Sequence, residues 1–250
     1  MSSDARERLL KLGQISRHND ASVGGKTSEF CCSQAASCVQ TKTHRPLYSY
    51  QRKHQTPAPT PDRTRTYIAS AAVENIMQAA EFAEVIERPL RHHLIIRWPT
   101  NDWSQHQPVQ QAMSKWLSRY SGGAFYVWAK EGNGGPHSHF LLYLETNRTR
   151  RFRSMLIRTL KRLTGLRSLK KGTVRCRNVF TFGSPIEHTQ NRVAYICKGA
   201  DPETRERLGI EKRDSCSLPG GKQAGVSQSL GVGARRNAAY CLLSGCRVRS

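Results

Sequence analysis

Two histidines, His137 and His139, are the residues whose type and spacing most clearly suggest chemistry. They lie in the segment HSHFLLYLE, which is rich in strand-forming residues, and side chains alternate between the two faces of a strand. Both imidazoles should therefore project from one face, where they can act as a pair of metal ligands. Histidines on a sheet are also often simply packed or solvated, so the neighbouring residues decide between the two interpretations.

A carboxylate stands shortly before the two histidines. Glu131 is followed by the sequence GNGG, which is typical of a hairpin turn. Because a hairpin reverses the chain, Glu131 should return to the start of the histidine strand and supply the oxygen that a hard divalent cation needs beside two nitrogens. Such a site leaves coordination positions open for a substrate. Glu145 is a weaker candidate for this role. Taken alone, Glu131 is better explained as a turn residue that faces solvent.

A nucleophile can come from the later segment AYICK. Tyr195 and Lys198 are three positions apart on a predicted helix, which makes them neighbours on one face. A metal that polarises a phosphodiester, together with a tyrosine that attacks phosphorus, forms a coherent nucleophilic site. Taken singly, Tyr195 is more typical of the edge of a core and Lys198 of a solvated surface.

The elements around these residues predict an α+β fold, with an antiparallel sheet and helices packed on one of its faces. The strongest local prediction is the hairpin, with strands over residues 124–130 and 137–145. The other predicted strands cover residues 92–99 and 173–182, and the predicted helices cover residues 71–87, 108–120, 148–164 and 186–198.

The 250 residues are enough for one well-packed domain with tails at both ends. Residues 1–70 are expected to form a flexible polar leader, because the stretch 44–61 has four prolines and no apolar periodicity. Residues 71–200 should form the catalytic domain. The Gly- and Ser-rich residues 201–250 are a tail to which no fold is assigned. The eight cysteines form no C-x-x-C pair and are interpreted as reduced thiols.

The charge of the chain favours nucleic acid as its partner. Forty Lys and Arg against eighteen Asp and Glu give a formal charge of +22, and between residues 148 and 198 fourteen basic residues face one acid, Glu187. The residues that we expect to contact phosphates are Arg97, Arg151, Arg158, Lys161 and Arg162. No run approaches the roughly 20 apolar residues of a membrane span, and residues 1–13 lack the apolar run of a secretion signal, so we expect a cytoplasmic protein without a membrane partner.

The order of these motifs resembles that of the HUH endonucleases, which include rolling-circle replication initiators, relaxases and single-tyrosine transposases. The resemblance covers residues 89–200 and is carried by HHLIIRWP, then EGNGGPHSHFLLYLE, then YICK. Tyr195 follows His139 by 56 positions, an interval that accommodates one helix, one strand and the nucleophile helix.

The resemblance implies that His137 and His139 bind Mg²⁺ or Mn²⁺ and that Glu131 completes or supports the site. It implies that Tyr195 becomes joined to a 5′ phosphate of single-stranded or hairpin DNA, leaving a 3′ hydroxyl, and that Lys198 steadies this phosphate. The implied activity is DNA nicking and joining, which initiates rolling-circle replication of a plasmid, phage or mobile element. The sequence leaves the origin, the recognised DNA sequence and the oligomeric state open.

One residue departs from the common family pattern. Ser138 stands between the histidines where the family usually has an apolar residue, which should weaken core packing but leave the metal face intact. One candidate nucleophile is visible, since Tyr195 has no second tyrosine a helical turn away, and this pattern suits a single-tyrosine initiator or transposase.

Two other classes of protein also fit parts of the sequence. A non-catalytic nucleic-acid-binding module would need the basic charge and aromatic residues able to stack on bases, for which Trp98, Tyr126 and Trp128 are candidates. A metal-dependent hydrolase of small molecules would need further ligands after the histidine pair, and among the later histidines there is His188 alone.

Overall fold

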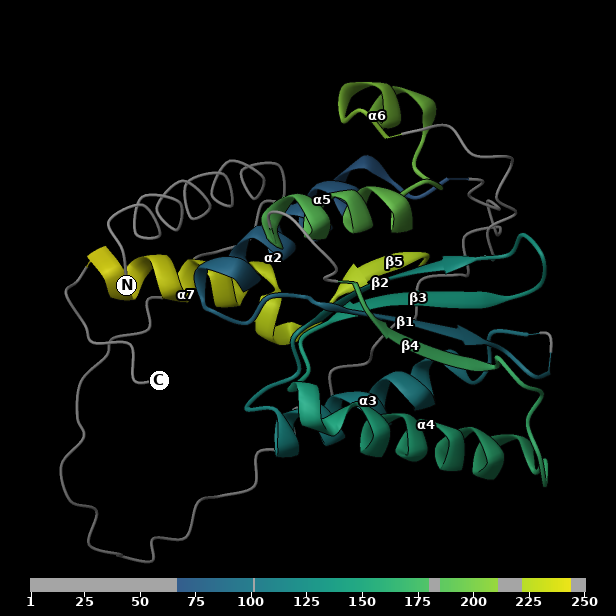
Figure 1. The fold of residues 1–250 in the computed structure, drawn as a ribbon. Helices are drawn as coiled ribbons and strands as arrows, with labels where there is room; N and C mark the ends of the chain where they lie inside the picture. Colours follow the sequence, from purple (N-terminus) through teal and green to yellow (C-terminus); the bar gives the residue numbers. More distant parts are fainter. Residues whose placement is uncertain (1–66, 101, 180–184, 211–221, 244–250) are drawn as a thin grey trace, which may run out of the picture.

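The structure is a computed structural model that describes residues 67–100, 102–179, 185–210 and 222–243. It contains an α+β fold around one antiparallel sheet, as predicted (Figure 1). The leader expected over residues 1–70 lies, up to residue 66, outside the described residues. In the described part of the chain no helix is long and apolar enough to cross a membrane.

The sheet has five strands in the order β4-β1-β3-β2-β5, and every pair of neighbours is antiparallel. The strands are β1 (His92–Arg97), β2 (Tyr126–Glu131), β3 (His137–Leu142), β4 (Val174–Asn178) and β5 (Ala224–Val226). The β2–β3 hairpin is the predicted one, with a turn in which Gly134 and Gly135 adopt positive φ angles of 70° and 96°. Its register places Glu131 opposite His137.

Helices cover both faces of the sheet, so the expectation of helices on one face is wrong (Figure 1). On one face lie α3 (His106–Tyr120) and α4 (Thr149–Thr164); on the other lie α2 (Ser70–Val85), α5 (Pro185–Ile196) and α7 (Val232–Leu243). The physical reason is that both faces of the central strands are apolar. Phe140 and Leu142 pack toward α3 and α4, whereas Leu141 packs toward α2 and α5.

The amphipathic helix α4 follows its predicted bounds and ends at Gly165, which has a φ of 70°. Phe152, Leu156 and Leu160 recur every fourth residue and are fully buried against the sheet. Leu163, which was expected to belong to this apolar stripe, is 38% exposed.

The tail after residue 200 contains structure that the sequence did not reveal. It forms α6 (Pro202–Arg207), a short 3-10 helix (Gln228–Leu230), β5 and α7. Strand β5 has three residues, too few to show a periodic pattern, but it pairs with β2 and so covers one side of the hairpin. Arg235 of α7 is 1% exposed and donates hydrogen bonds to the Leu230 carbonyl and to Asn75 of α2.

Ser138 lies in a polar cluster on the face of the sheet that packs against α3. It is fully buried, and its Oγ atom accepts a hydrogen bond from Trp98 Nε1 at 3.2 Å and lies 3.0 Å from His106 Nδ1. Ser138 is therefore matched by two polar partners, so the expected loss of packing is offset by hydrogen bonds.

Candidate metal and nucleophile site

Glu131, His137 and His139 meet at the turn end of the β2–β3 hairpin and form a group that could hold a metal ion. Their ligand atoms all lie within 4.8 Å of one another. The Oε2 atom of Glu131 is 2.9 Å from Nε2 of His139 and 3.3 Å from Nε2 of His137. Adjacent ligand atoms around an octahedral cation with bonds of about 2.1 Å are roughly 3 Å apart, so these spacings fit a shared ion.

A hydrogen bond at the other ring nitrogen of His137, Nδ1, supports the fit of these residues to a cation. Its Nδ1 atom donates to the Gly135 carbonyl at 2.8 Å, because a carbonyl oxygen can only accept. A neutral ring therefore presents the lone pair of Nε2 to the Glu131 carboxylate. Two acceptors that face each other repel unless a positive charge lies between them, and either a proton or a metal ion supplies that charge.

His139 is held from both sides. It is 2% exposed, and its Nδ1 atom lies 2.9 Å from Nε2 of His93 on β1, while its Nε2 atom faces Glu131. His93 was not among the predicted site residues. Its place depends on the pairing of β1 with β3, which sets His93 opposite Leu141 and diagonal to His139. The adjacent histidines in HHLIIR were the available signal, since alternation sends one of them to each face.

Tyr195 and Lys198 lie beside this cluster at the end of α5. The Tyr195 ring contacts His139 edge-on, with ring centroids 5.6 Å apart, and it contacts His93 at 5.9 Å. Lys198 Nζ is 2.7 Å from Oε1 of Glu131 and 4.7 Å from the centroid of the Tyr195 ring. The fold thus brings together the five residues predicted for metal binding and catalysis, and their chemical roles stay predictions.

The electrostatics of the cluster favour a charged Glu131 carboxylate and neutral imidazoles at His93 and His139. Burial alone would raise the pKa of Glu131, but contacts with His137, His139 and Lys198 outweigh it and hold this pKa far below its ordinary range. Burial lowers the pKa of His139 despite the nearby Glu131. Burial, followed by repulsion from His139, Arg192 and Lys198, lowers the pKa of His93 to about 3. Neutral imidazole is the form that binds metals.

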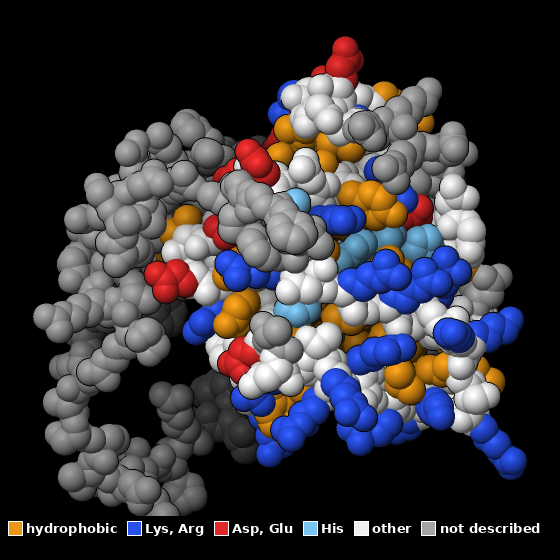
Figure 2. All heavy atoms as spheres, in the orientation of Figure 1, with side chains coloured by type: hydrophobic (Ala, Val, Ile, Leu, Met, Phe, Trp, Pro, Cys, Tyr) orange, Lys and Arg blue, Asp and Glu red, His pale blue; other side chains and the backbone are white. Residues whose placement is uncertain are grey.

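The predicted phosphate-binding residues fall on opposite faces of the sheet. Arg97 is exposed and stands opposite His137 in register, so it shares the face of the cluster. The α4 residues Arg151, Arg158, Lys161 and Arg162 belong to the other face. Two exposed arginines that were not predicted, Arg175 and Arg177, lie on the cluster's face of β4 beside β1. Figure 2 shows histidine side chains next to a band of Lys and Arg on this face.

Several weaker candidates lie elsewhere. Glu145 forms an ion pair with Arg148 and is not part of the candidate metal-binding group, and neither is His188. The aromatic residues proposed for base stacking, Trp98, Tyr126 and Trp128, are each 4% exposed and belong to the core beneath α3. They cannot stack on bases from this position, which removes one support for the non-catalytic alternative. Cys176 and Cys197 are free thiols, as expected.

Comparisons of the chain with known protein families, with curated proteins and with solved structures give no match.

Proposed function

We propose that this protein nicks and rejoins single-stranded DNA in a metal-dependent reaction, with Tyr195 as the nucleophile, in the manner of the HUH endonucleases. The observation that carries the proposal is the contact between Tyr195 and His139. A potential nucleophile and a potential metal ligand lie 56 positions apart in the sequence, yet their ring centroids are 5.6 Å apart. No apolar packing requirement explains why a carboxylate, imidazoles, a phenol and an ammonium gather at one point.

The residues have complementary tasks in this proposal. Glu131, His137 and His139 would hold Mg²⁺ or Mn²⁺, which when bound supplies a positive charge against the phosphoryl oxygens. The Gly135 carbonyl and His93 orient the two metal-binding imidazoles. Lys198, which pairs with Glu131, is close enough to Tyr195 to contact a phosphate as well.

The covalent step exchanges one phosphoester bond for another. The Tyr195 hydroxyl oxygen forms a bond to phosphorus and loses its proton, while the bond from phosphorus to the 3′ oxygen breaks. The released strand takes up a proton and ends in a 3′ hydroxyl, and the 5′ phosphate stays on Tyr195. The reverse reaction joins a 3′ hydroxyl to the same phosphate without an external energy source.

The charge on this face of the sheet suits a DNA strand. Arg97, Arg175 and Arg177 extend the basic surface away from the metal-binding group over β1 and β4. A strand that crosses them would place its phosphates beside Tyr195. In a cell, the activity would initiate rolling-circle replication of a plasmid, phage or mobile element, or serve a single-tyrosine transposase.

The test is the formation of a covalent protein–DNA adduct. Protein incubated with 5′- and 3′-labelled single strands and Mn²⁺ should retain the label on the 3′ side of the nick through SDS electrophoresis, whereas the label on the 5′ side should run as a shortened strand. Tyr195→Phe should bind the strand without forming an adduct, because it lacks only the attacking oxygen. An adduct with Tyr195→Phe would disprove the assignment of the nucleophile, and no adduct with the wild-type protein on any strand would leave a non-catalytic basic DNA-binding protein.

A further inference from the structure

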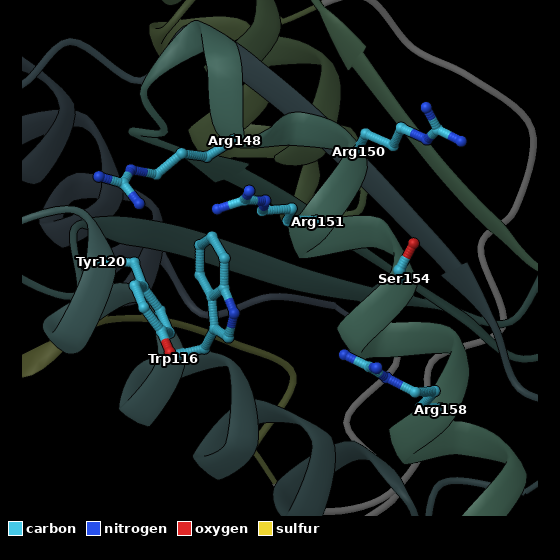
Figure 3. A pocket seen from close by; sticks show the side chains of 7 residues that line it. All are labelled: Trp116, Tyr120, Arg148, Arg150, Arg151, Ser154 and Arg158. Carbon is cyan, nitrogen blue, oxygen red and sulfur yellow. The ribbon is translucent and has the colours of Figure 1, made fainter.

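A second site candidate lies on the opposite face of the sheet, between α3 and α4. A cavity of about 490 Å³ is lined by Trp116 and Tyr120 of α3 and by four arginines, Arg148, Arg150, Arg151 and Arg158. Its volume falls within the range of about 300–1,000 Å³ that is typical of ligand pockets. Figure 3 shows Arg151 and Arg158 extending from α4 toward the aromatic pair, while Arg150 extends away from it.

Two neighbouring aromatic side chains, Trp116 and Tyr120, line one wall of the cavity. The ring centroids of Trp116 and Tyr120 are 4.9 Å apart, and those of Trp116 and Phe152 are 5.1 Å apart. Tyr120 is 37% exposed, and Trp116 is partly buried. These rings are therefore accessible to a ligand, in contrast to the aromatic residues of the core. The two ring planes are inclined by 45°, so a planar group can stack on one ring while its edge contacts the other.

Part of the positive charge in the cavity lacks a countercharge. Arg148 pairs with Glu145, and its guanidinium carbon lies 5.9 Å from the centroid of the Tyr120 ring. Arg151 and Arg158 are exposed, and no carboxylate in the described part of the chain pairs with either of them. The first turn of α4 contains no acidic residue. Guanidinium groups that lack a countercharge and face a cavity are suited to binding phosphate groups.

We infer that this cavity binds a nucleotide of a single-stranded DNA segment, with its base on Trp116 and Tyr120 and its phosphates on Arg151 and Arg158. The inference rests on the proposed DNA substrate, but it assigns a site that takes no part in the chemistry. Because the cavity and the metal-binding group lie on opposite faces of the sheet, this nucleotide belongs to a segment distant from the one that is cut. The site would hold the DNA during the reaction.

The experiment measures binding by the full-length protein in the presence of a chelator, so that no cleavage takes place. A short labelled strand is compared with an abasic strand that has the same number of phosphates. The wild-type protein should bind the base-bearing strand about tenfold more tightly, because stacking on an aromatic side chain contributes on that scale. Trp116→Leu and Tyr120→Leu should each reduce this preference. Because Tyr120 is already partly exposed, Tyr120→Leu should leave the packing of the protein largely unchanged.

The arginines are tested with a charge-matched control. Arg151→Gln/Arg158→Gln should weaken binding of the base-bearing strand about fivefold more than Lys161→Gln/Arg162→Gln, which removes the same charge from the same helix outside the cavity. In addition, a strand containing 5-iodouracil should photo-crosslink to the peptide that carries Trp116 and Tyr120. Free deoxynucleoside monophosphate should compete weakly, because it offers one phosphate.

Three results would overturn the inference: equal affinity for abasic and base-bearing strands, crosslinks confined to other peptides, or a free mononucleotide that binds as tightly as the strand. The outcome is independent of nicking. Tyr195→Phe should keep the preference for the base-bearing strand. A failure to detect cleavage would therefore not contradict the nucleotide site in the cavity, and equal binding of the two strands would not contradict the nicking proposal.

Discussion

Nε2 of His93 lies 2.9 Å from Nδ1 of His139, on the side of the His139 ring opposite to Glu131. The hydrogen bond between the two rings links β1 to the candidate metal-binding group. When Nε2 of His139 donates to Glu131, its Nδ1 atom must accept from His93. When a metal takes the Nε2 lone pair, Nδ1 of His139 must carry the hydrogen and donate to His93. His93 therefore matches either state by changing its tautomer.

The first prediction concerns this positioning role. His93→Ala should lower the Mn²⁺ affinity of the protein about tenfold or more, because removal of the partner that orients a metal-binding histidine typically has an effect of this size. Isothermal titration calorimetry measures the affinity. His92→Ala is the matched control, since His92 is the adjacent residue and faces the other side of the sheet. Equal Mn²⁺ affinities for His93→Ala and the wild-type protein would contradict the role.

The second prediction concerns the metal itself. Mn²⁺ at about 100 times its dissociation constant should stabilise the protein by about 2.7 kcal/mol, because the ion binds the folded chain alone. Thermal unfolding should show a higher Tm with Mn²⁺ than with chelator. The difference should disappear in His137→Ala/His139→Ala and persist in His188→Ala, which leaves the metal-binding group intact. A double variant that kept the full rise in Tm would show that His137 and His139 do not bind Mn²⁺.

The third prediction is a pH dependence of stability. Burial, with repulsion from Lys130, lowers the pKa of His106 from 6.5 to about 3. Below pH 6.5 the unfolded chain binds a proton that the folded chain excludes, so the stability is complete above this value and is lost as the pH falls toward 3. The loss from this residue is up to about 1.4 kcal/mol per pH unit.

Urea unfolding at two pH values tests this prediction. Between about pH 7 and pH 5, His106→Phe should lose about 2 kcal/mol less stability than the wild-type protein. The other buried histidines are present in both proteins, so the difference reports on His106. Equal losses in the two proteins would show that His106 is protonated in the folded state.

The fourth prediction concerns the arginines of β4. Arg175→Gln/Arg177→Gln should weaken binding to single-stranded DNA and reduce the slope of log affinity against log salt by up to about 1.4, because each phosphate contact contributes roughly 0.7. It should also slow cleavage at saturating DNA, since these residues share the face of the metal-binding group. Lys161→Gln/Arg162→Gln removes equal charge from the opposite face and should leave cleavage at saturation unchanged. An unaltered salt slope for the β4 variant would show that DNA avoids this strand.

The parts of the site that the sequence predicted depend on short stretches of chain. The hairpin brings Glu131 to His137 because a short connection of five residues joins their strands, and α4 follows from the spacing of Phe152, Leu156 and Leu160. The helix that carries Tyr195 was predicted to lie near the histidines on the basis of the resemblance to the HUH endonucleases. Its contact with His139 could not be derived from spacing alone.

The parts that were missed depend on pairing between distant segments. His93 reaches His139 because β1 pairs with β3, and Arg175 and Arg177 join the same face because β4 pairs with β1. The burial of Trp98 and Trp128 follows from α3, which covers the opposite face of the sheet. The second helical layer and β5 could not be foreseen, because a three-residue strand and the apolar run FLLYL leave no periodic signal.

The two strands that carry the metal-binding group have a neighbour on each side: β3 lies between β1 and β2, and β2 lies between β3 and β5. Backbone hydrogen bonds on both sides restrain both strands of the hairpin, which holds Glu131, His137 and His139 in place before any ligand binds. In the proposed reaction, the donors would keep their mutual geometry while one DNA end is exchanged for another. The same ligand atoms would then stabilise the transition state of cleavage and that of the reverse joining reaction, so both steps could use one site.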